Sequence, residues 1–161
     1  ELFLTDSPAS GELLTGIQPD NSQTIQEWLN FPYQQDEKYP EQLIHKTAGG
    51  IYVRSKSESL IALLLHMHGI PFRYECELQL GEIAVYPDFT IMHPKTEKIY
   101  YWEHFGLMDF PSYRKNVFSK LQLYTAHNII PSIQLITTYE TSEHPFDSAY
   151  AEQLIHYYFG D

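Results

Sequence analysis

Hydrophobic and polar residues follow distinct patterns after about residue 50, and these patterns predict one helix followed by three strands. Apolar residues at helical spacing follow Ser55-Lys56-Ser57-Glu58, an S-x-x-E sequence typical of a helix start, and the helix is expected to end at Gly69, just before Pro71. Runs rich in Tyr, Phe, Ile and Val predict strands at about 72–80, 84–92 and 98–105. The connections, Gly81-Glu82 and residues 93–97, are short enough for hairpins, so these strands are expected to be antiparallel.

The rest of the chain predicts two more helices and one more strand. A helix is expected to begin at Asp109-Phe110-Pro111, with proline near its first position, and to run to about His127. Residues 132–138 have the pattern of a buried strand, and Asp147 is expected to cap a last helix. The order helix, three strands, helix, strand, helix predicts an α/β fold in which helices flank a mixed sheet.

The first 48 residues form a separate, acidic and loop-rich segment in this interpretation. Residues 1–45 carry eight acidic side chains and one basic side chain, Lys38, and residues 24–29 predict a short helix. Gly49-Gly50 is interpreted as a hinge into an α/β domain at 49–161. Because the chain has no initiator Met, we expect it to be part of a longer protein whose other domains are its partners.

Composition narrows the classes of function. With 161 residues, 43% of them apolar and 19% charged, the chain can bury the core of one domain. Its formal net charge of −11 argues against a protein that coats nucleic acid by bulk charge, although a metal-dependent nucleic-acid enzyme also needs acidic residues. The single cysteine, Cys76, excludes an intramolecular disulfide and a cysteine-rich zinc module. The sequence has neither a basic leader nor an apolar run of membrane-spanning length, so we expect a cytoplasmic location and no membrane partner.

Two carboxylates carry the most informative chemistry. If the turn between the second and third strands is centred between Lys95 and Thr96, Asp88 lies directly opposite Glu103. Like charges in that position destabilise a sheet, so such a pair is typical of a shared proton, a bound cation or a basic side chain between them. Mg²⁺ and Mn²⁺ take oxygen ligands of this kind. The alternative is two exposed acids at a sheet edge.

Two further charged residues are candidates for the same place. Glu58 completes the S-x-x-E signal, which gives it a capping role, but it also shares a helical face with Ile61 and Leu65 and so points inward. Lys120 lies at the edge of the apolar arc of its helix, near Tyr124. A lysine there either extends along apolar surface to reach solvent or pairs with a carboxylate cluster or a phosphate.

These segments resemble a known family. Glu58 on the first helix, Pro87-Asp88 on the second strand and Glu103 on the third are similar to the motifs of the PD-(D/E)XK nuclease superfamily. The predicted order of elements matches its common core, the restriction-endonuclease-like fold. The sequences VRSKSE at 53–58, YPDFT at 86–90 and YYWEHFG at 100–106 are similar to a subgroup of uncharacterised bacterial proteins assigned to that superfamily. The resemblance covers about 51–140.

The resemblance implies a divalent metal site for Mg²⁺ or Mn²⁺. Asp88 and Glu103 would be the ligands, with Glu58 joining directly or through water, and the metal would activate a water for phosphate hydrolysis. The family motif has a lysine two residues after the glutamate, where this chain has Phe105. Some branches of the superfamily supply the lysine from the following helix, and Lys120 is the corresponding candidate here.

Three other side chains are candidates for the missing positive charge or for phosphate contacts. Lys56, beside the helix start, is the second choice for the lysine. His104 is the third, because strand alternation turns it to the other face of the sheet, where a hydrogen-bonded core histidine is the alternative. Arg54 joins Lys56, Arg114 and Lys115 in a patch that either holds phosphate or is solvated charge at helix ends.

We therefore expect a metal-dependent phosphodiesterase that hydrolyses nucleic acid, with DNA favoured over RNA. The alternative is a catalytically inactive nuclease-like module that binds protein or nucleic acid, which the missing lysine and the acidic charge favour. A glycosidase-like hydrolase that uses the paired carboxylates as acid and base is a third, less favoured interpretation. The sequence contains no G-x-S-x-G, P-loop or G-x-G-x-x-G motif, and its histidines lack metal-ligand spacing.

Overall fold

A four-stranded mixed sheet forms the centre of the fold in the computed structural model, which describes residues 21–160. Its strands are β3 (Phe72–Tyr74), β6 (Phe89–Met92), β7 (Ile99–Phe105) and β8 (Leu135–Tyr139). They lie in the order β3-β6-β7-β8, and only the β7–β8 pair is parallel. The mixed sheet and the flanking helices confirm the predicted α/β class.

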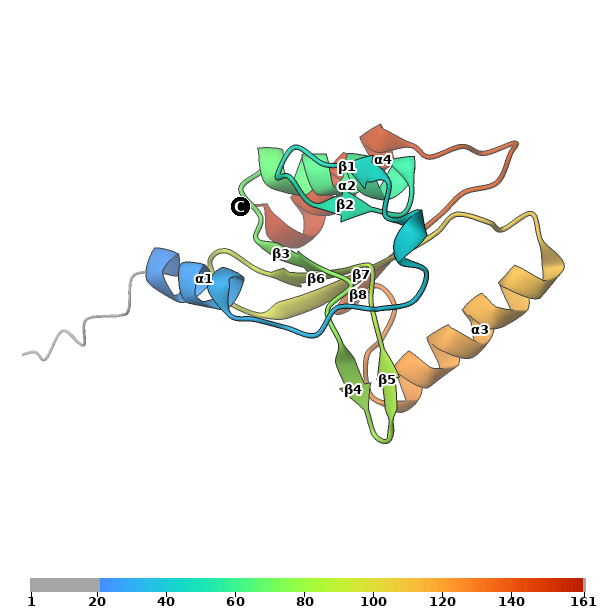
Figure 1. Cartoon of the computed structure of the whole chain (residues 1–161), viewed down its shortest axis with the longest axis horizontal. Coiled ribbons are helices and arrows are strands. Elements are labelled where there is room, and N and C mark those ends of the chain that lie inside the picture. The colour runs from blue at the N-terminus through green and yellow to red at the C-terminus, as the bar shows by residue number, and fades with distance from the viewer. Residues whose placement is uncertain (1–20, 161) are drawn as a thin grey trace, which may run out of the picture.

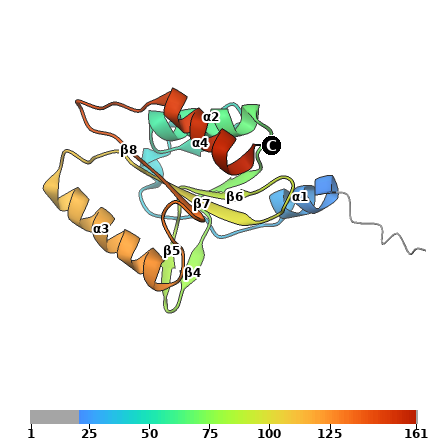
Figure 2. The ribbon, with the colours of Figure 1, turned by 180° about the vertical axis from the view of Figure 1, so that it is seen from behind.

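Helices cover both faces of this sheet. On one face lie α2 (Lys56–Met67) and α4 (Ser148–Phe159), and on the other lies α3 (Pro111–Ala126), as Figures 1 and 2 show. Side chains such as Leu65, Ile155 and the fully buried Trp102 form the core under α2 and α4. Tyr124 and Leu135 belong to a smaller core on the α3 face. Because successive β7 residues face opposite sides, β7 contributes to both layers.

The predicted hairpin between residues 72 and 92 is present, but it is interrupted halfway. A second pair of strands, β4 (Leu78–Leu80) and β5 (Ile83–Val85), continues the β3–β6 pairing in the same register and packs beside α3 (Figure 1). Each of the two long predicted strands is therefore divided in two. Glu75, with a left-handed φ of 49°, and Pro87, which has no N–H to donate, lie in the interruption.

The segment before α2 is attached to this core. It contains α1 (Asn21–Asn30), a 3-10 turn η1 (Pro40–Gln42), β1 (His45–Lys46) and β2 (Tyr52–Val53). β1 and β2 pair antiparallel, and Gly50 lies in their turn with a φ of 85°, so Gly49-Gly50 is a hairpin turn rather than the expected hinge. The short helix predicted at 24–29 is confirmed within α1, and the expected loop-rich character of residues 1–20 lies outside the described residues.

The N-terminal segment also covers the β3 edge of the sheet. Gln35 forms a bridge with Cys76, and the guanidinium of Arg73 stacks on Trp28 at 4.3 Å from the ring centre. The hydroxyl of Tyr33 donates to the main-chain carbonyl of Tyr74 at 3.2 Å. These contacts join a segment that composition separates from the α/β domain to the first strand of its sheet.

The helix ends follow local sequence signals. Ser55 caps α2 by accepting the main-chain N–H of Glu58 at 3.1 Å, and Asp147 caps α4 by accepting that of Tyr150 at 3.1 Å, both as predicted. At α3, Phe110 takes the cap position, and Asp109 instead accepts the N–H of Ser142 at 2.7 Å. No helix within residues 21–160 combines the length and apolar character that a membrane span requires.

Candidate functional site

The strand register brings Asp88 and Glu103 together. Phe89 pairs with Trp102 and Thr90 with Tyr101, which is the register expected from the turn, and one further step places Asp88 opposite Glu103. The carboxylate of Asp88 accepts the main-chain N–H of His104 through Oδ2 at 2.7 Å. Asp88 and Glu103 line one cavity of about 180 Å³ at the end of β7.

Lys120 reaches Glu103 from α3. Its Nζ lies 2.9 Å from Oε1 and 3.0 Å from Oε2 of Glu103, whose side chain is only 3% exposed. The hydroxyl of Tyr124, one turn further along α3, donates to Oε1 at 2.8 Å. Burial alone would lower the pKa of Lys120, but the charges of Glu103 and Asp88 outweigh it and raise that pKa. Lys120 therefore stays protonated and faces the carboxylates, which is the second of the two alternatives that its place on the helix left open.

Glu58 approaches from the other side of the site, in the first turn of α2. Its Oε2 accepts the hydroxyl of Ser55 at 2.6 Å, and its Oε1 accepts that of Tyr74 at 2.7 Å. Burial raises the pKa of Glu58 above its usual range, although both hydrogen bonds act in the opposite direction. Glu58 and Asp88 line a second cavity of about 520 Å³, so Asp88 lies on the walls of both cavities.

The three acids together carry more negative charge than Lys120 balances. The pKa of Asp88 is raised well above its ordinary value, first by burial and then by the charges of Glu103 and Glu58, against the opposing effects of Lys120 and the His104 N–H. A protein site with excess carboxylate charge gains by binding a proton or a cation.

The oxygen donors of the site determine whether it suits a divalent cation. Within residues 21–160, no three His, Cys, Asp or Glu side chains are close enough to form a metal site by themselves. Mg²⁺ is commonly held by one or two carboxylates, with water and substrate phosphate completing its coordination. Asp88 and Glu103 supply two such carboxylates in one cavity, and Glu58 lines the neighbouring cavity together with Asp88.

The cations near α2 differ in their availability. The guanidinium of Arg54 donates to both carboxylate oxygens of Glu75, at 2.5 and 3.1 Å, and to the carbonyl of Tyr39 at 2.7 Å. Arg54 therefore already has a buried anion as its partner, which argues against the phosphate contact expected of it. Lys56 is exposed and lines the larger cavity.

Successive residues of β7 after Glu103 point to opposite faces of the sheet. Phe105, at the position of the missing lysine, is buried against the ring of Tyr139. His104 points to the opposite face, as strand alternation predicted, and its ring is bound by Thr138 and Glu140 rather than by a main-chain carbonyl. Neither Glu140 nor Tyr124 was identified as a site residue from sequence, and only Tyr124 had a signal, its place on the inward arc with Lys120.

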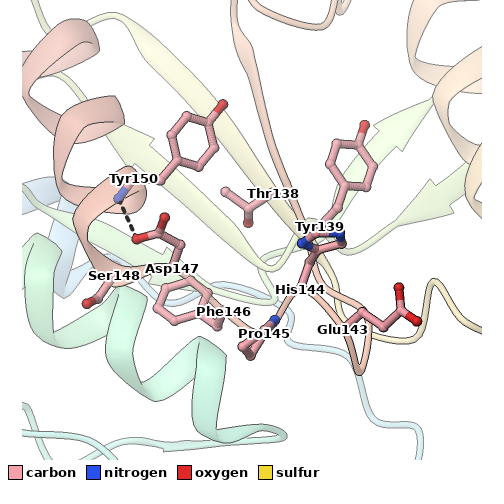
Figure 3. Close-up of a pocket in the computed structure, with 9 residues that line it drawn as sticks. All are labelled: Thr138, Tyr139, Glu143, His144, Pro145, Phe146, Asp147, Ser148 and Tyr150. Carbon is pink, nitrogen blue, oxygen red and sulfur yellow. Dashed lines mark hydrogen bonds between the residues drawn. The ribbon is translucent and has the colours of Figure 1, made fainter.

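A third cavity lies apart from the carboxylates. It has a volume of about 530 Å³ and is formed by the end of β8, the following loop and the start of α4 (Figure 3). The Asp147 cap of α4 lies in its wall, bonded to the main chain of Tyr150. None of the residues predicted to act in the site lines this cavity, so its size does not make it the functional centre.

Comparison with known proteins adds one partial relative. No family model and no solved structure matches the chain. The chain is 39% identical over 69 residues to the uncharacterized protein MJ1519 of Methanocaldococcus jannaschii. The match covers 43% of this chain and 6% of that protein, so the chain corresponds to a small part of a much longer relative.

Proposed function

We propose that this protein is a Mg²⁺- or Mn²⁺-dependent phosphodiesterase of the PD-(D/E)XK nuclease type, with a restriction-endonuclease-like core. The observation that supports it most is the ion pair between Lys120 and Glu103, opposite Asp88. The residue two positions after Glu103 is Phe105, so a lysine from α3 supplies the positive charge that the motif otherwise lacks. The sheet order and the placement of α2 and α3 are also compatible with such a core.

Each site residue has a role in this proposal. A bound Mg²⁺ or Mn²⁺ would supply Lewis-acid polarisation of a phosphate and an activated water. Asp88 and Glu103 would hold the ion, with Glu58 joining directly or through water. Lys120 would place a permanent positive charge beside the phosphate undergoing cleavage, and Tyr124 restrains Glu103 through its hydrogen bond.

Nucleic acid, with DNA favoured over RNA, is the proposed substrate. The net charge of −11 provides little attraction for a polyanion, since each phosphate contact contributes affinity only where a basic side chain meets it. Tight binding to a duplex is therefore expected to need other domains of a longer chain.

A catalytically inactive nuclease-like module is the second candidate. Lys120 and Tyr124 together already bind both carboxylate oxygens of Glu103, which favours a structural ion pair over a metal ligand. Such a module would bind protein or nucleic acid without cleaving a phosphodiester.

Thermal melts with and without Mn²⁺, on the wild type and Asp88→Asn, test the metal site first. An ion present at 100 times its Kd stabilises the fold by about 2.7 kcal/mol, which raises the melting temperature by several degrees. We expect this shift in the wild type and its loss in Asp88→Asn.

Cleavage assays on labelled single- and double-stranded DNA and RNA then test the reaction. We expect Lys120→Ala to lower the rate roughly 100-fold or more, as for the loss of one charged group at a reacting centre. Lys98→Ala is the control, because Lys98 is an exposed lysine in the turn between β6 and β7 and lies outside the candidate phosphate patch, and its rate is expected to stay within about twofold. Wild-type protein that shows neither a Mn²⁺ shift nor cleavage would favour the inactive module.

A further inference from the structure

The carboxylate of Asp88 is held from outside the regular pairing of the sheet. Asp88 lies one residue before β6, beyond the last paired residues of the β6–β7 ladder. Its main-chain carbonyl accepts the N–H of Glu75 at 3.0 Å, and its Oδ2 accepts the N–H of His104 at 2.7 Å. The direction of the carboxylate therefore depends on where the main chain of His104 points.

Three side chains hold the ring of His104. Nδ1 lies 2.8 Å from the hydroxyl of Thr138, and Nε2 lies 2.7 Å from Oε1 of Glu140. The ring of Phe146 meets it edge to face, with centres 5.5 Å apart. Thr138 and Phe146 both lie in the wall drawn in Figure 3, and the His104 side chain itself is only 2% exposed.

Hydrogen-bond partners indicate which nitrogen carries the proton. The indole N–H of Trp102 donates to the hydroxyl of Thr138 at 3.0 Å, which leaves that hydroxyl free to donate its own hydrogen to Nδ1 of His104. Nε2 then carries the proton and donates it to Glu140. With this assignment every polar group in the chain of contacts has a partner, so His104 is held in one orientation.

Glu140 extends these contacts to the helix that carries Glu58. Its Oε1 also accepts the hydroxyl of Ser57, the residue before Glu58 in the first turn of α2. Its main-chain N–H donates to the carbonyl of Phe105 at 3.0 Å, which continues the pairing of β7 with the chain after β8. One carboxylate thus connects the end of β7, the end of β8 and the start of α2, beside the cavity of about 520 Å³ that Glu58 and Asp88 line.

Building on the proposed function, we propose that His104 and Glu140 are positioning residues for Asp88. Glu140 fixes the imidazole of His104, and the fixed residue directs its main-chain N–H at the Asp88 carboxylate. Hydrogen bonds to groups behind a metal ligand orient that ligand, and their removal commonly weakens metal affinity 10–100-fold. His104 also lines both cavities, but in this role it acts through its main-chain N–H on the Asp88 carboxylate.

Two measurements on Glu140→Ala, Glu140→Gln and a control test this proposal. The control is Glu152→Ala, which removes the partner of another His–Glu pair, His68–Glu152, at 3.1 Å between α4 and the end of α2. The first measurement is hydrogen exchange at the His104 amide in metal-free protein, relative to amides of β6. We expect protection to fall about tenfold or more in Glu140→Ala, while Glu140→Gln, whose amide oxygen can still accept both hydrogen bonds, stays close to wild type.

The second measurement is the Kd for Mn²⁺ by titration calorimetry. We expect it to rise roughly 10–100-fold in Glu140→Ala and to stay near the wild-type value in Glu140→Gln and Glu152→Ala. An unchanged His104 amide in Glu140→Ala would overturn the proposal, and so would a deprotected amide with unchanged Mn²⁺ affinity. If the wild type binds no Mn²⁺, the metal-dependent function fails while the amide measurement still decides whether Glu140 positions Asp88.

Discussion

Asp88 is expected to lower the stability of the metal-free protein, so Asp88→Asn should raise it at neutral pH. Asparagine keeps an oxygen for the His104 N–H but removes one of three acidic charges at the site. Most substitutions of a partly buried hydrogen-bonded residue destabilise a fold, which makes the direction of this effect informative.

The magnitude follows from the pairing of Asp88 with Glu103. Side chains directly opposite on antiparallel strands lie about 5 Å apart, and two like charges at that distance repel by about 3 kcal/mol at an effective dielectric constant of about 20. The attraction of Lys120 offsets part of this repulsion. We therefore expect a net gain of about 1–2 kcal/mol, or roughly 2–8 °C in melting temperature for a domain of this size.

The free energy of unfolding should also depend on pH, because the pKa of Asp88 differs between the folded and unfolded states. The unfolded chain titrates Asp88 near the ordinary value of 3.8, whereas burial and the neighbouring acids raise the folded pKa well above it. Between these two pKa values the folded state binds more protons than the unfolded state, so wild-type stability falls as the pH rises through that window. Asp88→Asn lacks the part of this fall that Asp88 causes, while the part from Glu58, whose pKa burial also raises, remains. The advantage of Asp88→Asn over the wild type should therefore disappear near pH 4.

Urea denaturation in excess chelator, at several pH values between 4 and 8, measures the effect. Glu82→Gln is the control, because it removes one acidic charge at the exposed hairpin turn between β4 and β5. If Asp88→Asn is less stable than the wild type at pH 7.5 without metal, the site does not hold excess negative charge and the reasoning is refuted.

Two further substitutions test the ion pairs, each by urea denaturation. Lys120→Ala leaves Glu103 buried without its cation and should lower the free energy of unfolding by about 1–2 kcal/mol. This loss is smaller than for a fully buried pair because Lys120 is 33% exposed. An unchanged free energy of unfolding would mean that the pair is not formed in solution. Arg54→Ala leaves the buried Glu75 unpaired and should cost about 2–4 kcal/mol, whereas Lys56→Ala, two residues away and exposed, should cost less than about 0.5 kcal/mol. Equal effects of Arg54→Ala and Lys56→Ala would contradict the structural role given to Arg54.

Sequence patterns predicted the parts of the site geometry that a single hairpin or a single helix determines. Turn length sets the register of a hairpin, which is why Asp88 and Glu103 could be placed opposite each other from sequence. The helical period placed Lys120 on the inward edge of α3, and the S-x-x-E signal placed Glu58 in the first turn of α2. In each case one short segment contains all the information.

Long-range contacts explain what sequence could not give. The bond from Ser57 to Glu140 joins residues 83 positions apart, and no spacing within either segment indicates it. The break in the long hairpin depends on the left-handed backbone of Glu75, which apolar alternation does not reveal. Gly49-Gly50 gave the wrong interpretation because two glycines fit a tight hairpin turn as well as a hinge, and only the pairing of β1 with β2 distinguishes them.

The attachment of the N-terminal segment to β3 limits where the chain can be truncated. A boundary at residue 49, which composition suggests, would remove Gln35 and Trp28 and uncover the edge of the sheet at Arg73 and Cys76. An uncovered strand edge presents unpaired main-chain groups that recruit other chains. Residues 28–36 cover this edge, and a fragment that begins at residue 49 is therefore expected to aggregate where the chain that retains them stays dispersed.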